Sequence, residues 1–591
     1  MKKKFELNQT PILSGYFNDF VIFLFVVGCL FSITSVLEAG AWVLSGARWT
    51  EKDEKVYEDF VKALGESGYG NVNRFVKDSK LNPLYGEEDK VFNLSPDCAD
   101  LPYVVRAYVA YKLRLPFLYM TDISGRGGDQ RYSNGNRPQD EKDQDGFSSP
   151  QNLFSRVTLI NSGYYRMGPE IQGCDTYPVK IQKSSIVPGT IYYDPNGHVG
   201  LVYQVTPEGR IRIVDAHPDR SLSRPWFGAK FAMGNKTLGA GFRRWRPIWY
   251  SSDGHSHRQP NINIPDFSDS DQYMKKFRLG AMENLSYFDY VRFKLSEKGG
   301  RLNPIEEFRS SIYEIHEDIK YRVTAVEICL KDGINKREHP GSLPWNIYGT
   351  DGDWEKYSTP SRDARLKVAF QEFFNRTVQM IRMAENGDPS LEFSGDANRL
   401  AKELLSIYDN LTPLVSVSYL NSQGKQIALN FHEIVQRLFM LSFDPYHSVE
   451  YRWGATGEEL KTSPDGPLKQ KMYKLEARLR NQLERVYNCP TPYDLGPENP
   501  MDINVRQWLS KYLSGEIRSL VVSAPTSQAN TTPLTATVVP DIKTETNVSV
   551  KPNIQIEPGK QMLRLAGSLF KNVDDIVLDL ISLHLKSQIK N

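Results

Sequence analysis

A polar turn at residues 95–97 leads directly into a segment with helical periodicity, and this junction constrains the fold more than any other feature of the chain. The residues that follow it repeat at helical spacing: Leu101, Val104, Val105, Tyr108, Val109 and Leu113. We therefore expect Ser95-Pro96-Asp97 to cap a helix that starts at Cys98. The positive end of the helix dipole would favour a thiolate there, and the nearby unpaired N–H groups could stabilise an oxyanion.

A second pattern predicts a histidine at the start of a strand. The turn Asp194-Pro195-Asn196-Gly197 precedes His198, which opens an alternating apolar run to Val205. Residues 207–209 form a turn and residues 211–214 lead out of it, so the two runs predict an antiparallel hairpin. Residues 190–193 predict one further strand.

Together these patterns predict a nucleophile and a base. A lone cysteine is usually a small buried hydrophobe and a lone histidine is usually structural, but an imidazole beside a thiol can activate it. Asp215 and His217 share a face of the returning strand and are the candidates for a third group that orients His198. Asp215 is favoured because a carboxylate stabilises imidazolium directly, and His217 is the alternative. Asp215 could instead only cap the turn before Pro218.

Three motifs resemble the NlpC-type cell-wall cysteine peptidases, a branch of the papain-like superfamily, over residues 85–250. They are Asp97-Cys98-Ala99-Asp100-Leu101 with the later Leu115-Pro116, then Val187-Pro188-Gly189-Thr190-Ile191-Tyr192-Tyr193, and Gly197-His198-Val199-Gly200-Leu201-Val202-Tyr203. The resemblance implies catalysis by Cys98, His198 and Asp215 through an acyl-enzyme, with the Cys98 backbone N–H as an oxyanion donor and no cofactor. Ala99-Asp100 replaces the family's Ser-Gly, Thr190 replaces an Asp, and the spacing from cysteine to histidine is longer.

Composition excludes several other classes of protein. With 73 basic and 71 acidic residues the net charge is +2, which gives no reason to expect a nucleic-acid partner. Five cysteines in 591 residues do not make a disulfide framework. The absence of Cys-x-x-Cys and His-Glu-x-x-His motifs gives no support for a metal site.

The N-terminus predicts export. Basic residues 2–4 precede an uncharged apolar run from Phe20 to Leu37, and Ala39-Gly40-Ala41 offers a cleavage site. We expect residues 1–41 to be a signal peptide or a membrane anchor. Joined to the resemblance above, this implies a bacterial envelope protein that is periplasmic, secreted or anchored to the inner membrane. A buried core helix and acylation at Cys29 are the alternatives.

The predicted fold class is α+β, with a nucleophile helix packed on a small antiparallel sheet and a mostly helical domain after it. The expected divisions are a papain-like domain at 50–250 with a polar exposed insertion at 125–151, a linker at 251–270, a helical domain at 271–520, a disordered linker at 521–560 and an amphipathic helix at 561–591. Residues 271–520 or the last helix could bind a protein partner, and the last helix could instead dock on a membrane.

Three functions follow as expectations. The resemblance and the export signal together imply an exported cysteine peptidase or amidase that cleaves stem peptides of peptidoglycan. A papain-like acyltransferase or an ester or lipid hydrolase could use the same three residues. A non-catalytic envelope protein that binds peptide or acyl groups, or acts as a scaffold, is the third possibility.

Overall fold

The computed structural model describes residues 41–280, 282–349, 351–485 and 491–517, which belong to one compact unit. The predicted signal segment before residue 41, the predicted linker at 521–560 and the predicted helix at 561–591 lie outside these residues. Within the described ranges, no helix combines the length and the apolar character needed to cross a bilayer.

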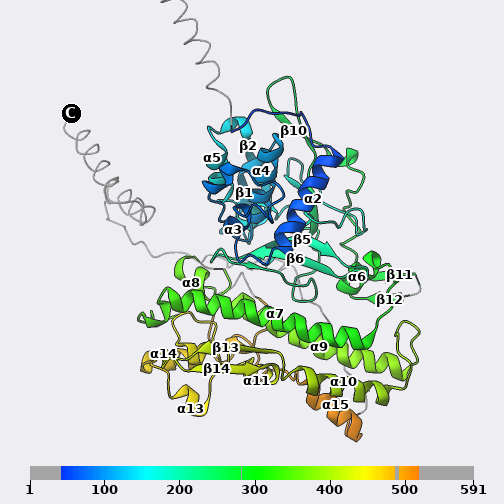
Figure 1. Cartoon of the computed structure of the whole chain (residues 1–591), viewed down its shortest axis with the longest axis vertical. Helices are drawn as coiled ribbons and strands as arrows, with labels where there is room; N and C mark the ends of the chain where they lie inside the picture. Colours follow the sequence, from blue (N-terminus) through cyan, green and yellow to red (C-terminus); the bar gives the residue numbers. More distant parts are fainter. Residues whose placement is uncertain (1–40, 281, 350, 486–490, 518–591) are drawn as a thin grey trace, which may run out of the picture. The chain divides into compact units, whose positions relative to one another are not determined.

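A six-stranded antiparallel sheet, with strand order β3-β8-β4-β5-β6-β7, forms the centre of the N-terminal region (Figure 1). Its strands are β3 (Thr176–Pro178), β4 (Ile191–Asp194), β5 (His198–Val205), β6 (Ile211–Ala216), β7 (Leu222–Ser223) and β8 (Gly241–Trp245). Strands β5 and β6 form the predicted hairpin, in which Gly200 lies opposite Asp215 and Leu201 opposite Val214. The prediction of an α+β fold with an antiparallel sheet and a later helical region is confirmed.

The two faces of the sheet are covered by different elements. Helices α2 (Glu51–Glu66) and α4 (Leu101–Leu113) pack on the face that carries Val199 and Leu201, together with α3 (Val72–Val76) and α5 (Pro150–Val157). Helix α6 (Tyr287–Leu295) and residues 227–242 cover the face that carries Val202 and Ile213. Because strand side chains alternate, His198 and Asp215 belong to this second face.

Two polar segments have more structure than their composition suggests. The predicted insertion at 125–151 is mostly exposed, but most of it belongs to a hairpin of β1 (Leu118–Arg126) and β2 (Asn134–Asp143), because the backbone ladder needs no apolar side chains. The predicted linker at 251–270 contains β10 (Ser256–Arg258), which pairs with β9 (Ile248–Tyr250). It also buries Ile264, and Ser268 donates its backbone N–H to Pro178.

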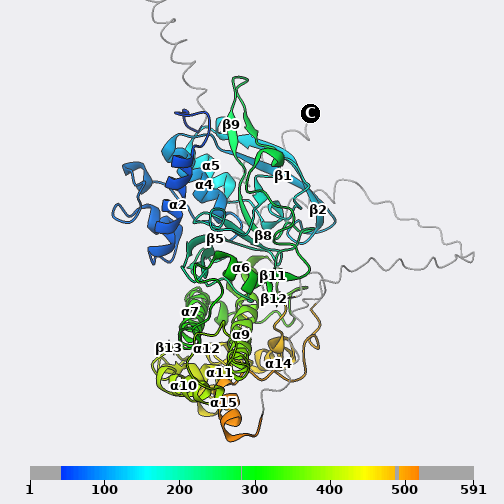
Figure 2. The ribbon, with the colours of Figure 1, turned by 90° about the vertical axis from the view of Figure 1, so that its right-hand side faces the viewer.

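The remaining region is mostly helical, as predicted. It contains the hairpins β11–β12 (Phe277–Leu279, Met282–Leu285) and β13–β14 (Ser416–Leu420, Gln426–Asn430). Its helices after α6 are α7 (Pro304–Lys331), α8 (Gly352–Tyr357), α9 (Pro360–Glu385), α10 (Ala397–Leu411), α11 (Phe431–Arg437), α12 (Val449–Arg452), α13 (Gly457–Leu460), α14 (Pro467–Leu475) and α15 (Val505–Ser514). Helices α7 and α9 run alongside each other between β5–β6 and β13–β14 (Figures 1 and 2). Helix α9 starts at the predicted Pro360.

Candidate active site

Cys98 lies in the turn that enters α4, and the helix itself starts three residues later at Leu101. Asp97 organises this turn: its side chain accepts the backbone N–H of Ala99 at 3.0 Å, and its carbonyl accepts that of Leu101 at 3.1 Å. Ser95 takes no part, since its hydroxyl donates to Asn93. The predicted helix start is therefore correct to within one turn, and Asp97 alone provides the capping interaction.

The sulfur of Cys98 contacts the backbone on both sides of His198. It lies 3.8 Å from the carbonyl oxygen of Gly197 and accepts the backbone N–H of Val199. Burial, followed by the charges of Asp97 and Asp100, raises the pKa of the Cys98 thiol well above its ordinary value. Burial therefore opposes the thiolate that the helix dipole would favour.

His198, Asp215, Ser223 and His217 form one chain of hydrogen bonds. The Nε2 atom of His198 lies 2.5 Å from Oδ2 of Asp215. The hydroxyl of Ser223 donates to Oδ1 of the same carboxylate and lies 3.0 Å from Nε2 of His217. Of the two candidates for the third position, Asp215 is thus the one bonded to His198, whereas the His217 ring stacks on the His198 ring at 5.8 Å between centroids.

This chain fixes the tautomer of His198. Burial opposes ionisation of Asp215, but His217, His198 and Arg365 together hold the pKa of its carboxyl below the ordinary range. An ionised carboxylate only accepts hydrogen bonds, so Nε2 of His198 carries the proton and Nδ1 keeps its lone pair. Burial and the charge of Arg365 lower the pKa of His198, which makes the ring a neutral base at physiological pH.

Cys98 and His198 line the same cavity, which has a volume of about 430 Å³. No hydrogen bond joins the two side chains: the sulfur sits beside the backbone at the start of β5, and the imidazole extends toward the face that carries Asp215. Gly200 allows Ile213 to pack closely against this face, because a Cβ there would lie 2.4 Å from Cγ2 of Ile213. In the described part of the chain, the Cys98 backbone N–H and Nδ1 of His198 have no hydrogen-bond partner, so both remain available to a substrate.

The helical region forms the opposite wall of the cavity. Residues 347–348, 355 and 358–362 line it, together with Arg365. Arg362 pairs with Asp219 at 2.8 Å, and NH1 of Arg365 lies 3.8 Å from Oδ2 of Asp215. The site is therefore built from both regions of the chain.

A second cluster in the helical region has the composition of a metal site. His339, Asp444 and Glu476 are buried, and their ligand atoms lie within 4.8 Å of one another. However, Nδ1 of His339 accepts the backbone N–H of Gly341 at 2.8 Å, so the proton of the neutral ring is on Nε2, which donates to Asp444 at 2.7 Å. A metal-bound histidine instead donates its second N–H, so these residues fit a hydrogen-bonded cluster better than a metal centre.

Sequence reasoning located Cys98, His198 and Asp215 but missed Ser223, Arg362 and Arg365. Ser223 lies opposite Asp215 in the pairing of β6 with β7. In the sequence, only the short segment after the turn at 217–220 could have indicated that the chain comes back beside Asp215. The two arginines lie more than 140 positions after Asp215 and carry no local signal, because only tertiary packing brings them to the cavity. No family model, curated protein or solved structure matches this chain.

Proposed function

We propose that this protein is a papain-like cysteine hydrolase that cleaves amide bonds through Cys98, His198 and Asp215. The observation that carries the proposal is the combination of an imidazole held by a buried carboxylate at 2.5 Å with a half-buried thiol in the same cavity. Cys174 and Cys329, the other cysteines of the described part of the chain, are buried outside this cavity.

The proposed mechanism starts from a neutral pair. Because the thiol is protonated and His198 is neutral, Nδ1 of His198 accepts the thiol proton as the sulfur attacks the carbonyl carbon. His198 then donates this proton to the leaving amine, and water hydrolyses the acyl-enzyme. Asp215 stabilises the imidazolium that forms at each step.

The proposal requires the sulfur to approach Nδ1 when substrate binds. Catalytic hydrogen bonds are often long without substrate and tighten in the bound complex. A rotation about the Cα–Cβ bond of Cys98 moves the sulfur without disturbing the turn. The unpartnered backbone N–H of Cys98 serves as an oxyanion donor, and such donors lower the barrier by about 3 kcal/mol.

The resemblance to NlpC-type peptidases supports peptidoglycan stem peptides as the substrate and the bacterial envelope as the location. Of the positions that depart from the family pattern, Ala99 lines the cavity with a small side chain, and Arg131 and Tyr132 of the longer cysteine-to-histidine spacing also line it. Asp100 is buried, lies 3.9 Å from Arg220 and is not part of the cavity wall. The Thr190 hydroxyl donates to the Ser185 carbonyl at 2.9 Å and so has a local structural role.

The first experiment compares Cys98→Ala with Cys174→Ala. We expect Cys98→Ala to lower the hydrolysis of muropeptides more than 1,000-fold while the melting temperature stays close to that of the parent protein. The buried Cys174, whose pKa burial raises to about 11, is the matched control and its variant should keep its activity. Mass spectrometry of the products separates hydrolysis from acyl transfer. Undiminished turnover by Cys98→Ala would remove this cysteine from the mechanism.

A second experiment tests the approach of the two side chains. A short bifunctional haloketone alkylates a thiol first and can then react with an imidazole within reach. We expect peptide mapping to find Cys98 joined to His198, and only singly modified Cys98 in a His198→Gln variant. Singly modified Cys98 in the parent protein as well would show that the two groups do not meet.

A further inference from the structure

Helix α9 brings two arginines from the helical region to the β5–β6 hairpin. Arg362 and Arg365 lie near the N-terminus of α9, and the residues just before them line the same cavity as Cys98 and His198. Both side chains are largely buried, with 15% and 14% of their surfaces exposed. Charges at this depth are screened little by solvent, so they act strongly on their neighbours.

Arg365 faces the carboxylate that holds His198. Its NH1 atom lies 3.8 Å from Oδ2 of Asp215, the same oxygen that Nε2 of His198 contacts. The other oxygen of Asp215 accepts the hydroxyl of Ser223. The guanidinium therefore approaches the triad on the side of the imidazole and not on the side of Ser223.

Ion pairs around the cavity fix the start of α9 and its surroundings. Arg362 pairs with Asp219 at 2.8 Å, Arg131 pairs with Glu355 of α8 at 2.8 Å, and Arg485 pairs with Asp194 of β4 at 2.8 Å. Each of the three joins the helical region to the sheet region. Arg365 is thus one of four arginine–carboxylate contacts between the two regions near this cavity.

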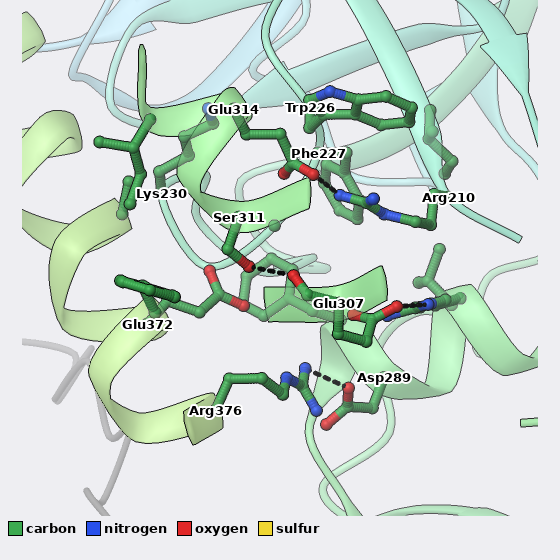
Figure 3. Close-up of a pocket in the computed structure, with 18 of the residues that line it drawn as sticks. Arg210, Trp226, Phe227, Lys230, Asp289, Glu307, Ser311, Glu314, Glu372 and Arg376 are labelled. Atoms are coloured by element: carbon green, nitrogen blue, oxygen red, sulfur yellow. Dashed lines mark hydrogen bonds and ion pairs between the residues drawn. The ribbon is translucent and has the colours of Figure 1, made fainter. Parts of the chain in front are cut away.

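A second set of polar contacts holds α9 further along its length (Figure 3). Arg376 of α9 pairs with Asp289 of α6 at 2.7 Å, and Glu372 of α9 accepts the backbone N–H of Ala229 at 3.0 Å. These residues line a small cavity of about 110 Å³ that the close-up shows. With contacts at both places, α9 has little freedom to move its arginines away from Asp215.

The charged and titratable groups that face His198 come from four elements. Asp215 and His217 belong to β6 and the loop after it, Asp194 to β4, Cys98 to the turn before α4 and Arg365 to α9. Arg365 is the cationic residue whose charge opposes protonation of the ring, and the carboxylates of Asp215 and Asp194 favour protonation. The helical region thus supplies the charge that counteracts both carboxylates.

We propose that Arg365 is a positioning residue of the active site, which holds Asp215 as a carboxylate and keeps the His198 imidazole in its neutral, proton-accepting form. This inference rests on the proposed hydrolase function for its catalytic meaning. It makes the helical region part of the proposed active site, because α9 supplies the arginine that lies against the Asp215 carboxylate.

The test is the pKa of His198 measured by NMR in protein with ¹³C-labelled histidine, in a Cys98→Ala background that removes the thiol titration. Removing the neighbouring cation makes protonation easier, so Arg365→Gln should raise the pKa of His198 by about one pH unit. Arg365→Lys retains the charge and should stay close to the parent value. Arg399→Gln removes an exposed arginine of α10 that pairs with Glu403 and is the matched control, with no change expected.

Hydrolysis by the same variants with Cys98 intact gives the second readout. The acid limb of the pH–activity profile should move to higher pH in Arg365→Gln, and in Arg365→Lys it should lie where it lies in the parent protein. An unchanged pKa of His198 in Arg365→Gln would overturn the inference even if the enzyme is active. A raised pKa in a protein without any hydrolytic activity would support the role of Arg365 in setting the charge of His198 and would refute the proposed function instead.

Discussion

Two buried histidines in the described part of the chain form hydrogen bonds to an aspartate, and the two pairs differ in what the second ring nitrogen contacts. His198 bonds Asp215 at 2.5 Å and His339 bonds Asp444 at 2.7 Å, in each case through Nε2. In both pairs the carboxylate is fully buried. Nδ1 of His339 accepts the backbone N–H of Gly341, whereas Nδ1 of His198 has no hydrogen bond to any described residue.

Their surroundings differ as well. His198 borders a cavity of about 430 Å³ that also contains a thiol. His339 has Glu476 beside its Asp444 partner, and burial, followed by the charge of Asp444, raises the pKa of Glu476 well above its ordinary range. The His339 pair, which we call the sealed pair, thus adjoins a carboxyl whose ionisation is opposed by burial and by Asp444. In the His198 pair, which we call the open pair, Nδ1 has no hydrogen bond to any described residue. A histidine–aspartate hydrogen bond alone does not define a catalytic site.

The largest expected difference comes from removing each histidine. His198→Ala should lower hydrolysis at least 1,000-fold, because it removes the general base, and should cost less stability than His339→Ala, because Ser223 and Arg365 still contact the Asp215 carboxylate. His339→Ala should lower the free energy of unfolding by about 3 kcal/mol, because it leaves Asp444 buried without its donor. The folded fraction of that variant should keep its specific activity. Urea unfolding and kcat/KM measured on the same samples test both expectations, and a loss of specific activity in His339→Ala would break the distinction between the two pairs.

In the proposed mechanism only the open pair exchanges a proton with substrate, so the pH dependence of hydrolysis sharpens the comparison. The base must be neutral, and burial together with Arg365 lowers the pKa of His198. Activity should therefore remain constant as the pH falls to about 6.5 and decline only below that value. Profiles of kcat/KM from pH 8 to pH 4.5, with circular dichroism to verify folding at each pH, measure this limb. A decline centred above pH 6.5 would show that the charge around His198 favours imidazolium.

The smallest effect is expected at the serine that belongs to each cluster. Ser223 connects Asp215 to His217, and Ser442 lies 2.6 Å from Nδ1 of His447 in the sealed cluster. Each Ser→Ala change should cost about 1–2 kcal/mol of stability, because it leaves a buried group without its partner. Only Ser223→Ala should also lower kcat, by about tenfold, since Asp215 then loses one of the groups that hold it. Equal kcat values for the two variants would show that Ser223 does not orient the triad.

Much of the local structure of the site could be predicted from the sequence. The turn at Asp97, the stripe of α4 and the alternation of β5 and β6 are short-range patterns, and they placed Cys98 and His198 correctly on their elements. In the hairpin, Asp215 pairs with Gly200, and Gly200 follows His198 by two residues. These features follow from the helix and strand periods alone.

The parts that sequence reasoning missed depend on burial and distant packing. The dipole of α4 favoured a thiolate at Cys98, but burial and the neighbouring Asp97 and Asp100 outweigh it. Arg365 reaches Asp215 only because α9 packs against the sheet region. The sequence of α9 contains no pattern that predicts this packing. The polar composition of 125–151 concealed a hairpin whose stability comes from backbone bonds.

The shared cavity has a practical consequence for how the protein can be divided. A fragment that ends near residue 250 would contain Cys98, His198 and Asp215 but would lack the wall formed by residues 347–365. During synthesis this wall is missing until α9 has left the ribosome, so the nascent chain carries Cys98 and His198 long before the cavity is complete. Expression boundaries drawn around the first region would therefore cut through the cavity and not beside it.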